Sequence, residues 1–113
     1  MITIYHNPRC TKSRQGVAYL KDLGMDFETV LYLVNPIDTE TLKSLLKKLN
    51  YAPIELVRKN EAIWKEQFKG KQLSDEQIIE AMIEFPKLME RPIIVKESKA
   101  VIGRPTETID KLF

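Results

Sequence analysis

The first third of the chain alternates apolar and polar positions in a way that predicts a strand, a helix and a second strand. Ile2 to Tyr5 is a short β-type segment that begins almost at the first residue. A helix is expected from about Thr11 to Leu23, with Gly24 as its stop. Its apolar face would consist of Gly16, Tyr19, Leu20 and Leu23. Phe27 to Val34 is rich in β-branched, aromatic and leucine residues and predicts a buried strand that Asn35-Pro36 ends. Such a unit normally places its two strands side by side and parallel.

The middle of the chain, about residues 38–86, has a helical pattern. Leucines at positions 42, 45, 46 and 49 follow helical spacing, and Asp38 or Thr39 is the expected cap. A short helix should follow Asn60 and use Ile63 and Phe68. Another should run from Ser74 to about Phe85, because Ser74 and Gln77 form a capping-box pattern and Pro86 ends the run.

The last third returns to strands. Ile93–Val95 and Ala100–Ile102 flank the polar segment Lys96–Lys99, which predicts a β-hairpin. Pro105 suits the first turn of a final helix that reaches Phe113. The order β-α-β, helical insert, β-β-α predicts an α/β fold with one domain over residues 1–113 and an insert at about 38–86 between the second and third strands.

The composition and charge of the chain argue against several classes of function. The chain has 113 residues, 43% hydrophobic and 30% charged, which is typical of a globular domain. Its net charge of +2 comes from interleaved basic and acidic residues, so we expect no nucleic-acid partner. No apolar run has the length of a membrane span, and no signal peptide is visible. The absence of metal-ligand clusters and of a phosphate-binding glycine loop predicts neither a metal nor a bound cofactor, and we expect a monomer.

The single cysteine, Cys10, is the strongest candidate for chemistry. It follows the first strand and a Pro-containing loop and precedes the first helix. This position would place the sulfur at a helix N-terminus, where unpaired N–H groups and the helix dipole favour thiolate over thiol. Because one cysteine cannot form an internal disulfide, the protein suits a reducing compartment, and we expect it in the cytoplasm.

Four local signatures occur in order along the chain: Ile2 to Cys10, Leu56 to Asn60, Arg91 to Val95, and Gly103 to Glu107. Together they resemble the glutathione- and glutaredoxin-dependent arsenate reductases, the ArsC-like proteins. The resemblance implies a thioredoxin-like fold with a four-stranded mixed sheet flanked by helices. It also makes Pro92 a candidate for a cis peptide bond.

The resemblance implies that Cys10 is the nucleophile and that Arg58, Arg91 and Arg104 hold the oxyanion. Guanidinium groups stay charged and present a planar fork of donors, which suits a tetrahedral oxyanion such as arsenate. They would also lower the pKa of the thiol, which is only about 3% ionised at pH 7 when its pKa is ~8.5. In the implied mechanism glutathione then serves as thiol co-substrate, arsenite leaves, and glutaredoxin clears the mixed disulfide.

Four further residues near Cys10 are candidates for substrate binding or for tuning its pKa. His6 is either a packed strand-end residue or a modulator of the thiol. The Ser13 hydroxyl would bond the thiolate or serve the first helical turn. Asn7 and Arg14 are expected to shape the loop and the helix start.

Two alternative functions remain open at the level of sequence. One is a glutathione-dependent thiol reductase with a substrate other than arsenate. The other is an Spx-like regulator that binds RNA polymerase. Such regulators use a Cys-x-x-Cys switch, and Ser13 occupies the second position of that motif here.

Overall fold

The computed structural model describes all 113 residues, and the chain divides into two compact units. The first unit combines residues 1–35 with residues 91–113, and the second comprises residues 36–90. The prediction of a single domain over the whole chain stays a prediction.

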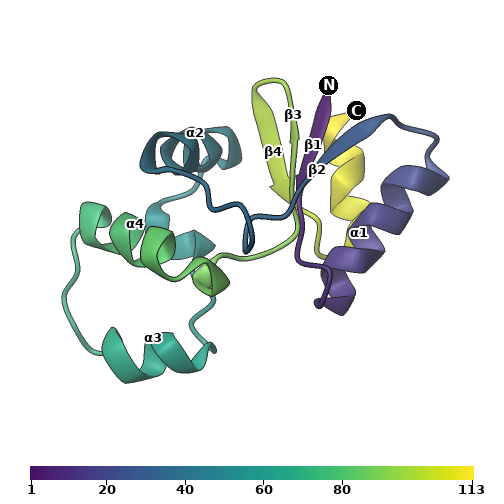
Figure 1. Cartoon of the computed structure of the whole chain (residues 1–113). Coiled ribbons are helices and arrows are strands. Elements are labelled where there is room, and N and C mark those ends of the chain that lie inside the picture. The colour runs from purple at the N-terminus through teal and green to yellow at the C-terminus, as the bar shows by residue number, and fades with distance from the viewer. The chain divides into compact units, whose positions relative to one another are not determined.

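The first unit contains a mixed four-stranded sheet (Figure 1). Its strands are β1 (Ile2–Tyr5), β2 (Phe27–Val30), β3 (Ile93–Lys96) and β4 (Lys99–Ile102). Their order is β2-β1-β3-β4. β1 pairs with β2 in parallel and with β3 antiparallel, and β3 and β4 form the expected hairpin. This sheet, with a helical segment between β2 and β3, confirms the predicted α/β, thioredoxin-like fold.

Helix α1 (Thr11–Asp22) and the 3-10 helix η3 (Thr106–Leu112) share the hydrophobic core of this unit with the sheet. In Figure 1 both lie on the same side of the strands. The buried residues of this core are Ile2, Ile4, Leu20, Ile94, Ile109 and Leu112. Every second residue of β1 points into it, as the period of a strand requires. The N-terminus of α1 is thereby fixed at the end of β1.

Four expectations for this unit need correction. β2 ends at Val30 rather than Val34, because the chain turns there: the Val34 and Asn35 N–H groups donate to the Leu31 carbonyl. β2 is also an edge strand and is not fully buried. Leu23 is 43% exposed, since α1 ends one residue before it and Gly24 takes a positive φ of 71°. The last helix is a 3-10 helix, with Pro105 just before it.

The second unit is helical. It contains α2 (Thr39–Leu49), η1 (Pro53–Leu56), α3 (Ala62–Gln67), α4 (Asp75–Glu84) and η2 (Pro86–Leu88). Asp38 caps α2 by accepting from the Thr41 N–H at 2.8 Å. Ser74 and Gln77 form the predicted capping box of α4.

The four leucines of α2 are buried as expected. In α3, Trp64 is the buried residue, whereas Ile63 and Phe68 are half-buried. The aromatic rings of this region contact one another: Trp64 stacks on Phe68 with 5.4 Å between ring centroids, and Phe68 meets Phe85 edge-on at 6.0 Å. No helix of the chain combines the length and the apolar character needed to cross a membrane.

Candidate active site

Cys10 is the residue that caps the N-terminus of α1. Its backbone is extended, with φ −95° and ψ 121°. The Cys10 N–H donates to the Asn7 carbonyl at 3.0 Å, and the Arg14 N–H donates to the Cys10 carbonyl at 3.0 Å. These two bonds fix the backbone on both sides of the sulfur. The side chain is therefore held at the start of the helix, as the sequence predicts.

The surroundings of Cys10 favour the thiolate. Partial burial raises the pKa of the thiol, but hydrogen bonds and charge lower it further than burial raises it. The donors are the Arg91 side chain and the backbone N–H groups of Ser13 and Lys12, and the Arg91 charge adds to them. The net shift in the pKa of the Cys10 thiol is downward. Its direction agrees with the expectation from sequence.

Arg91 reaches Cys10 from the segment that leads into β3. The peptide bond that joins it to Pro92 is cis, as the resemblance suggested, and the Arg104–Pro105 bond is cis as well. Pro92 is fully buried, and two glycines leave room for its ring. A Cβ on Gly16 would lie 2.8 Å from Pro92 Cγ, and one on Gly103 would lie 3.2 Å from it. Close packing against α1 and the end of β4 thus positions the Arg91 side chain.

Ser13 anchors the loop before Cys10. It is fully buried, and its Oγ accepts from the Asn7 N–H at 3.0 Å and pairs with His6 Nδ1 at 2.7 Å. Two roles were considered for the Ser13 hydroxyl: a bond to the Cys10 thiolate and a bond within the first turn of the helix. The structure shows neither of them. Ser13 contributes to Cys10 through its backbone, and its side chain joins the end of β1 to α1.

His6 is a buried strand-end residue whose ring is engaged by Ser13. Burial lowers the pKa of His6, and the nearby Arg14 charge lowers it further. The imidazole is accordingly neutral near pH 7. A neutral ring adds no positive charge beside the thiolate, so the downward shift at Cys10 comes from Arg91 and the backbone.

Asn7 and Arg14 shape the loop. Asn7 Oδ1 accepts from the Arg9 N–H at 3.0 Å. The exposed Arg14 guanidinium donates to the Pro8 carbonyl at 2.8 Å and to Thr11 Oγ1 at 3.1 Å. Both residues hold the backbone around Cys10, which is the role that the sequence favoured for them.

The three arginines predicted to gather around the oxyanion differ in the unit to which they belong and in the groups near them. Arg91 hydrogen bonds with Cys10. Arg104 belongs to the same unit and lines a pocket. Arg58 belongs to the second unit, where it forms an ion pair with Glu61 at 3.4 Å. A shared cradle of all three arginines stays a prediction.

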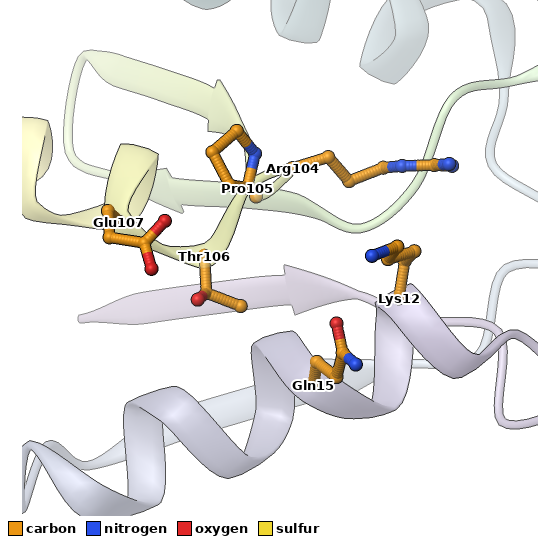
Figure 2. Close-up of a pocket in the computed structure, with 7 residues that line it drawn as sticks. Lys12, Gln15, Arg104, Pro105, Thr106 and Glu107 are labelled. Atoms are coloured by element: carbon orange, nitrogen blue, oxygen red, sulfur yellow. The ribbon is translucent and has the colours of Figure 1, made fainter.

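The pocket beside α1 was not predicted from the sequence. Its volume is about 350 Å³, and Lys12, Gln15, Arg104, Thr106 and Glu107 contribute side chains to it. Figure 2 shows that these side chains come from the start of α1 and from the segment after β4. The signature Gly103 to Glu107 marks one side of the pocket in the sequence. The two sides lie about 90 residues apart in the chain, so the spacing of residues did not predict that they form a pocket.

A family model for the ArsC family matches residues 5–112 of the chain. An uncharacterised Escherichia coli protein, YfgD, is 49% identical over 110 residues, which cover 96% of this chain and 92% of that protein. Arsenate reductases of Neisseria meningitidis are 37% identical and cover 99% of this chain and 97% of their own length.

Solved structures show the same similarity. The arsenate reductase from Vibrio cholerae is 38% identical, with a TM-score of 0.94 and coverage of 99% of this chain and 97% of that chain. A putative arsenate reductase from Yersinia pestis is 41% identical, with a TM-score of 0.93, and covers 98% and 99%. Sequence and fold thus agree over nearly the whole chain.

Proposed function

Because the chain belongs to the ArsC family, we propose that it is an arsenate reductase whose nucleophile is the Cys10 thiolate. The observation that carries this proposal is the setting of Cys10. Its sulfur lies at the N-terminus of α1, where the Arg91 guanidinium and two backbone N–H groups favour the thiolate. These donors lower the pKa of the thiol and would also stabilise negative charge on a bound oxyanion.

The first proposed step forms a bond between Cys10 Sγ and arsenic. Near neutral pH arsenate is an anion, so a thiolate that attacks it must approach like charge. The Arg91 guanidinium, and the guanidinium groups of Arg58 and Arg104 in the proposed cradle, would offset that repulsion by charge-assisted hydrogen bonds. One arsenic–oxygen bond breaks, and the oxygen leaves as water after it takes up protons from the medium.

The second proposed step reduces arsenic. A glutathione thiolate bonds to Cys10 Sγ, the sulfur–arsenic bond breaks, and its electron pair stays on arsenic, which passes from the +5 to the +3 state and leaves as arsenite. Cys10 is now in a mixed disulfide with glutathione. Since the chain contains no second cysteine, an external thiol must reduce this disulfide, and we propose glutaredoxin for that role.

Arsenite formation from arsenate, glutathione and glutaredoxin tests the function. Cys10→Ser should abolish turnover, and Arg91→Ala should lower kcat/KM by about tenfold to a hundredfold, the range for a charged group that stabilises a developing anion. Arg9→Ala, which removes an exposed arginine beside Cys10, is the matched control.

Absence of arsenite from the wild-type protein, under conditions in which a known arsenate reductase is active, would overturn the proposed function. Full activity of Arg91→Ala would overturn the role of Arg91 while leaving the function intact. Arg58→Ala and Arg104→Ala in the same assay decide whether the other two arginines take part.

A further inference from the structure

We propose that the pocket lined by Lys12, Gln15, Arg104, Thr106 and Glu107 binds the thiol co-substrate, a zwitterionic thiol peptide of the glutathione type. The inference rests on the proposed function, because that reaction consumes such a thiol. The argument uses the position, the size and the charges of the pocket.

Each of the two walls of the pocket lies close to a residue near Cys10. On one side, Lys12, which lines the pocket, lies in the first turn of α1 two residues after Cys10. On the other side, Gly103 lies so close to the Pro92 ring that an added Cβ would meet it at 3.2 Å, and Pro92 follows Arg91, a partner of the sulfur. These neighbours place the pocket near Cys10, as a site for the attacking thiol requires.

The size of the pocket exceeds that of an oxyanion. About 350 Å³ lies at the lower end of the range for small-molecule sites, which suits a tripeptide. A tetrahedral oxyanion would fill a small part of this space. Most of the pocket would then stay filled with water, and few of its polar groups would be used.

The charges also favour a zwitterion over a simple anion. Lys12 and Arg104 supply two positive groups, and Glu107 supplies a negative one. Glutathione has two carboxylates and one ammonium group, so each charge of the pocket has a counterpart of opposite sign. A phosphate-like or arsenate ion beside Glu107 would be repelled by that carboxylate and would leave it without a positively charged partner. Figure 2 shows Gln15 and Thr106 between the charged side chains, where they can bond to peptide amides.

The rate of mixed-disulfide formation tests this site without arsenate. The Cys10 thiolate attacks oxidised glutathione, which gives the Cys10–glutathione disulfide and releases one glutathione thiolate. Mass spectrometry follows this reaction, and the same reaction with bis(2-hydroxyethyl) disulfide, an uncharged probe, serves as reference. The ratio of the two rates cancels any change in the pKa or reactivity of Cys10.

We expect the wild-type protein to prefer oxidised glutathione over the uncharged disulfide. Lys12→Gln and Glu107→Gln should each lower this preference by about fivefold, which corresponds to the loss of one exposed charge pair. Lys21→Gln removes the same charge from the other end of α1 and is the matched control, since Lys21 is exposed and does not line the pocket.

An unchanged preference in both Lys12→Gln and Glu107→Gln would overturn the thiol site. An increased preference in Glu107→Gln would also overturn it, because Glu107 would then repel the ligand rather than hold its ammonium group. The outcome is separate from arsenate turnover. A wild-type protein that forms arsenite normally but shows no preference for oxidised glutathione would reject the site alone. A wild-type protein that reacts selectively with oxidised glutathione but forms no arsenite would support the site while rejecting the proposed function.

Discussion

Replacement of Gly16 by alanine should disturb the active site from within the core. Gly16 lies on the buried face of α1, and an added Cβ would lie 2.8 Å from Pro92 Cγ and 3.5 Å from Ile4 Cδ1. Ordinary contacts between carbon atoms are about 3.5–4.0 Å long, so α1 or the Pro92 segment must move by several tenths of an ångström. Because Pro92 follows Arg91, this movement should weaken the hydrogen bond from Arg91 to Cys10.

Two effects of opposite sign set the change in stability. Overpacking of a buried site costs about 1–3 kcal/mol. Alanine is favoured over glycine inside a helix by about 1 kcal/mol. The expected net change for Gly16→Ala is a loss of roughly 0–2 kcal/mol in the free energy of unfolding. Ala18→Gly at an exposed position of the same helix measures the second effect alone, with the opposite sign.

Urea unfolding gives the change in stability, and the pH dependence of Cys10 alkylation gives the change at the active site. The midpoint of alkylation should move to higher pH in Gly16→Ala and stay unchanged in Ala18→Gly. The reasoning fails if Gly16→Ala gains as much stability as Ala18→Gly loses and its alkylation profile matches that of the wild type. The added methyl group would then be accommodated without movement.

Three further predictions concern the neighbours of Cys10. Arg91→Gln should raise the pKa of Cys10, because it removes a hydrogen bond and a positive charge, and alkylation should therefore start at higher pH. Ser13→Ala should lower the free energy of unfolding by about 1–3 kcal/mol in urea, since the buried Asn7 N–H loses its acceptor. The pKa of His6 lies below 6.5 in the folded chain, so the free energy of unfolding should fall as the pH drops below 6.5, and His6→Asn should flatten this dependence.

Each of these predictions has a control and an outcome that contradicts it. Arg9→Gln removes an exposed charge beside Cys10, and an alkylation shift as large as that of Arg91→Gln would show a general charge effect. Ser98→Ala removes an exposed hydroxyl in the β3–β4 turn, and an equal loss of stability would mean that the bonds of Ser13 carry no special weight. NMR titration of His6, the one histidine of the chain, measures its pKa directly, and a value above 6.5 would contradict the downward shift expected from burial and the Arg14 charge.

Much of the fold follows from local patterns in the sequence. The helix around Leu42–Leu49, the Ser74 capping box and the hairpin around Lys96–Lys99 each depend on residues that are close in the chain, and the structure confirms them. The predicted length of β2 was wrong, because an apolar run such as Leu31–Val34 does not reveal where the pairing with a neighbouring strand stops. Sheet edges are set by tertiary pairing, which the local pattern does not contain.

For the candidate site, too, only features that depend on contiguous residues could be predicted from the sequence. The helix-start position of Cys10 could be predicted, since loop, cysteine and helix are contiguous. The close contact of Gly16 with Pro92 could not be predicted, because it depends on packing between residues far apart in the chain. The pocket formed by Lys12 and Glu107 was missed for the same reason.

The role of position 13 bears on where the second thiol comes from. A resolving cysteine must reach the sulfur of Cys10 with its own side chain, yet the Ser13 hydroxyl is fully buried and bonded to His6 and to the Asn7 N–H. The Ser13 side chain therefore supports the loop, and it does not take the position that a resolving cysteine would need. In the proposed reaction, that support occupies the sequence position of a second thiol in the chain, and reduction at Cys10 would use an external thiol. The proposed thiol site in the charged pocket at Lys12 would supply that external thiol, so the residues proposed to activate Cys10 and those proposed to bind the thiol would all belong to the first unit.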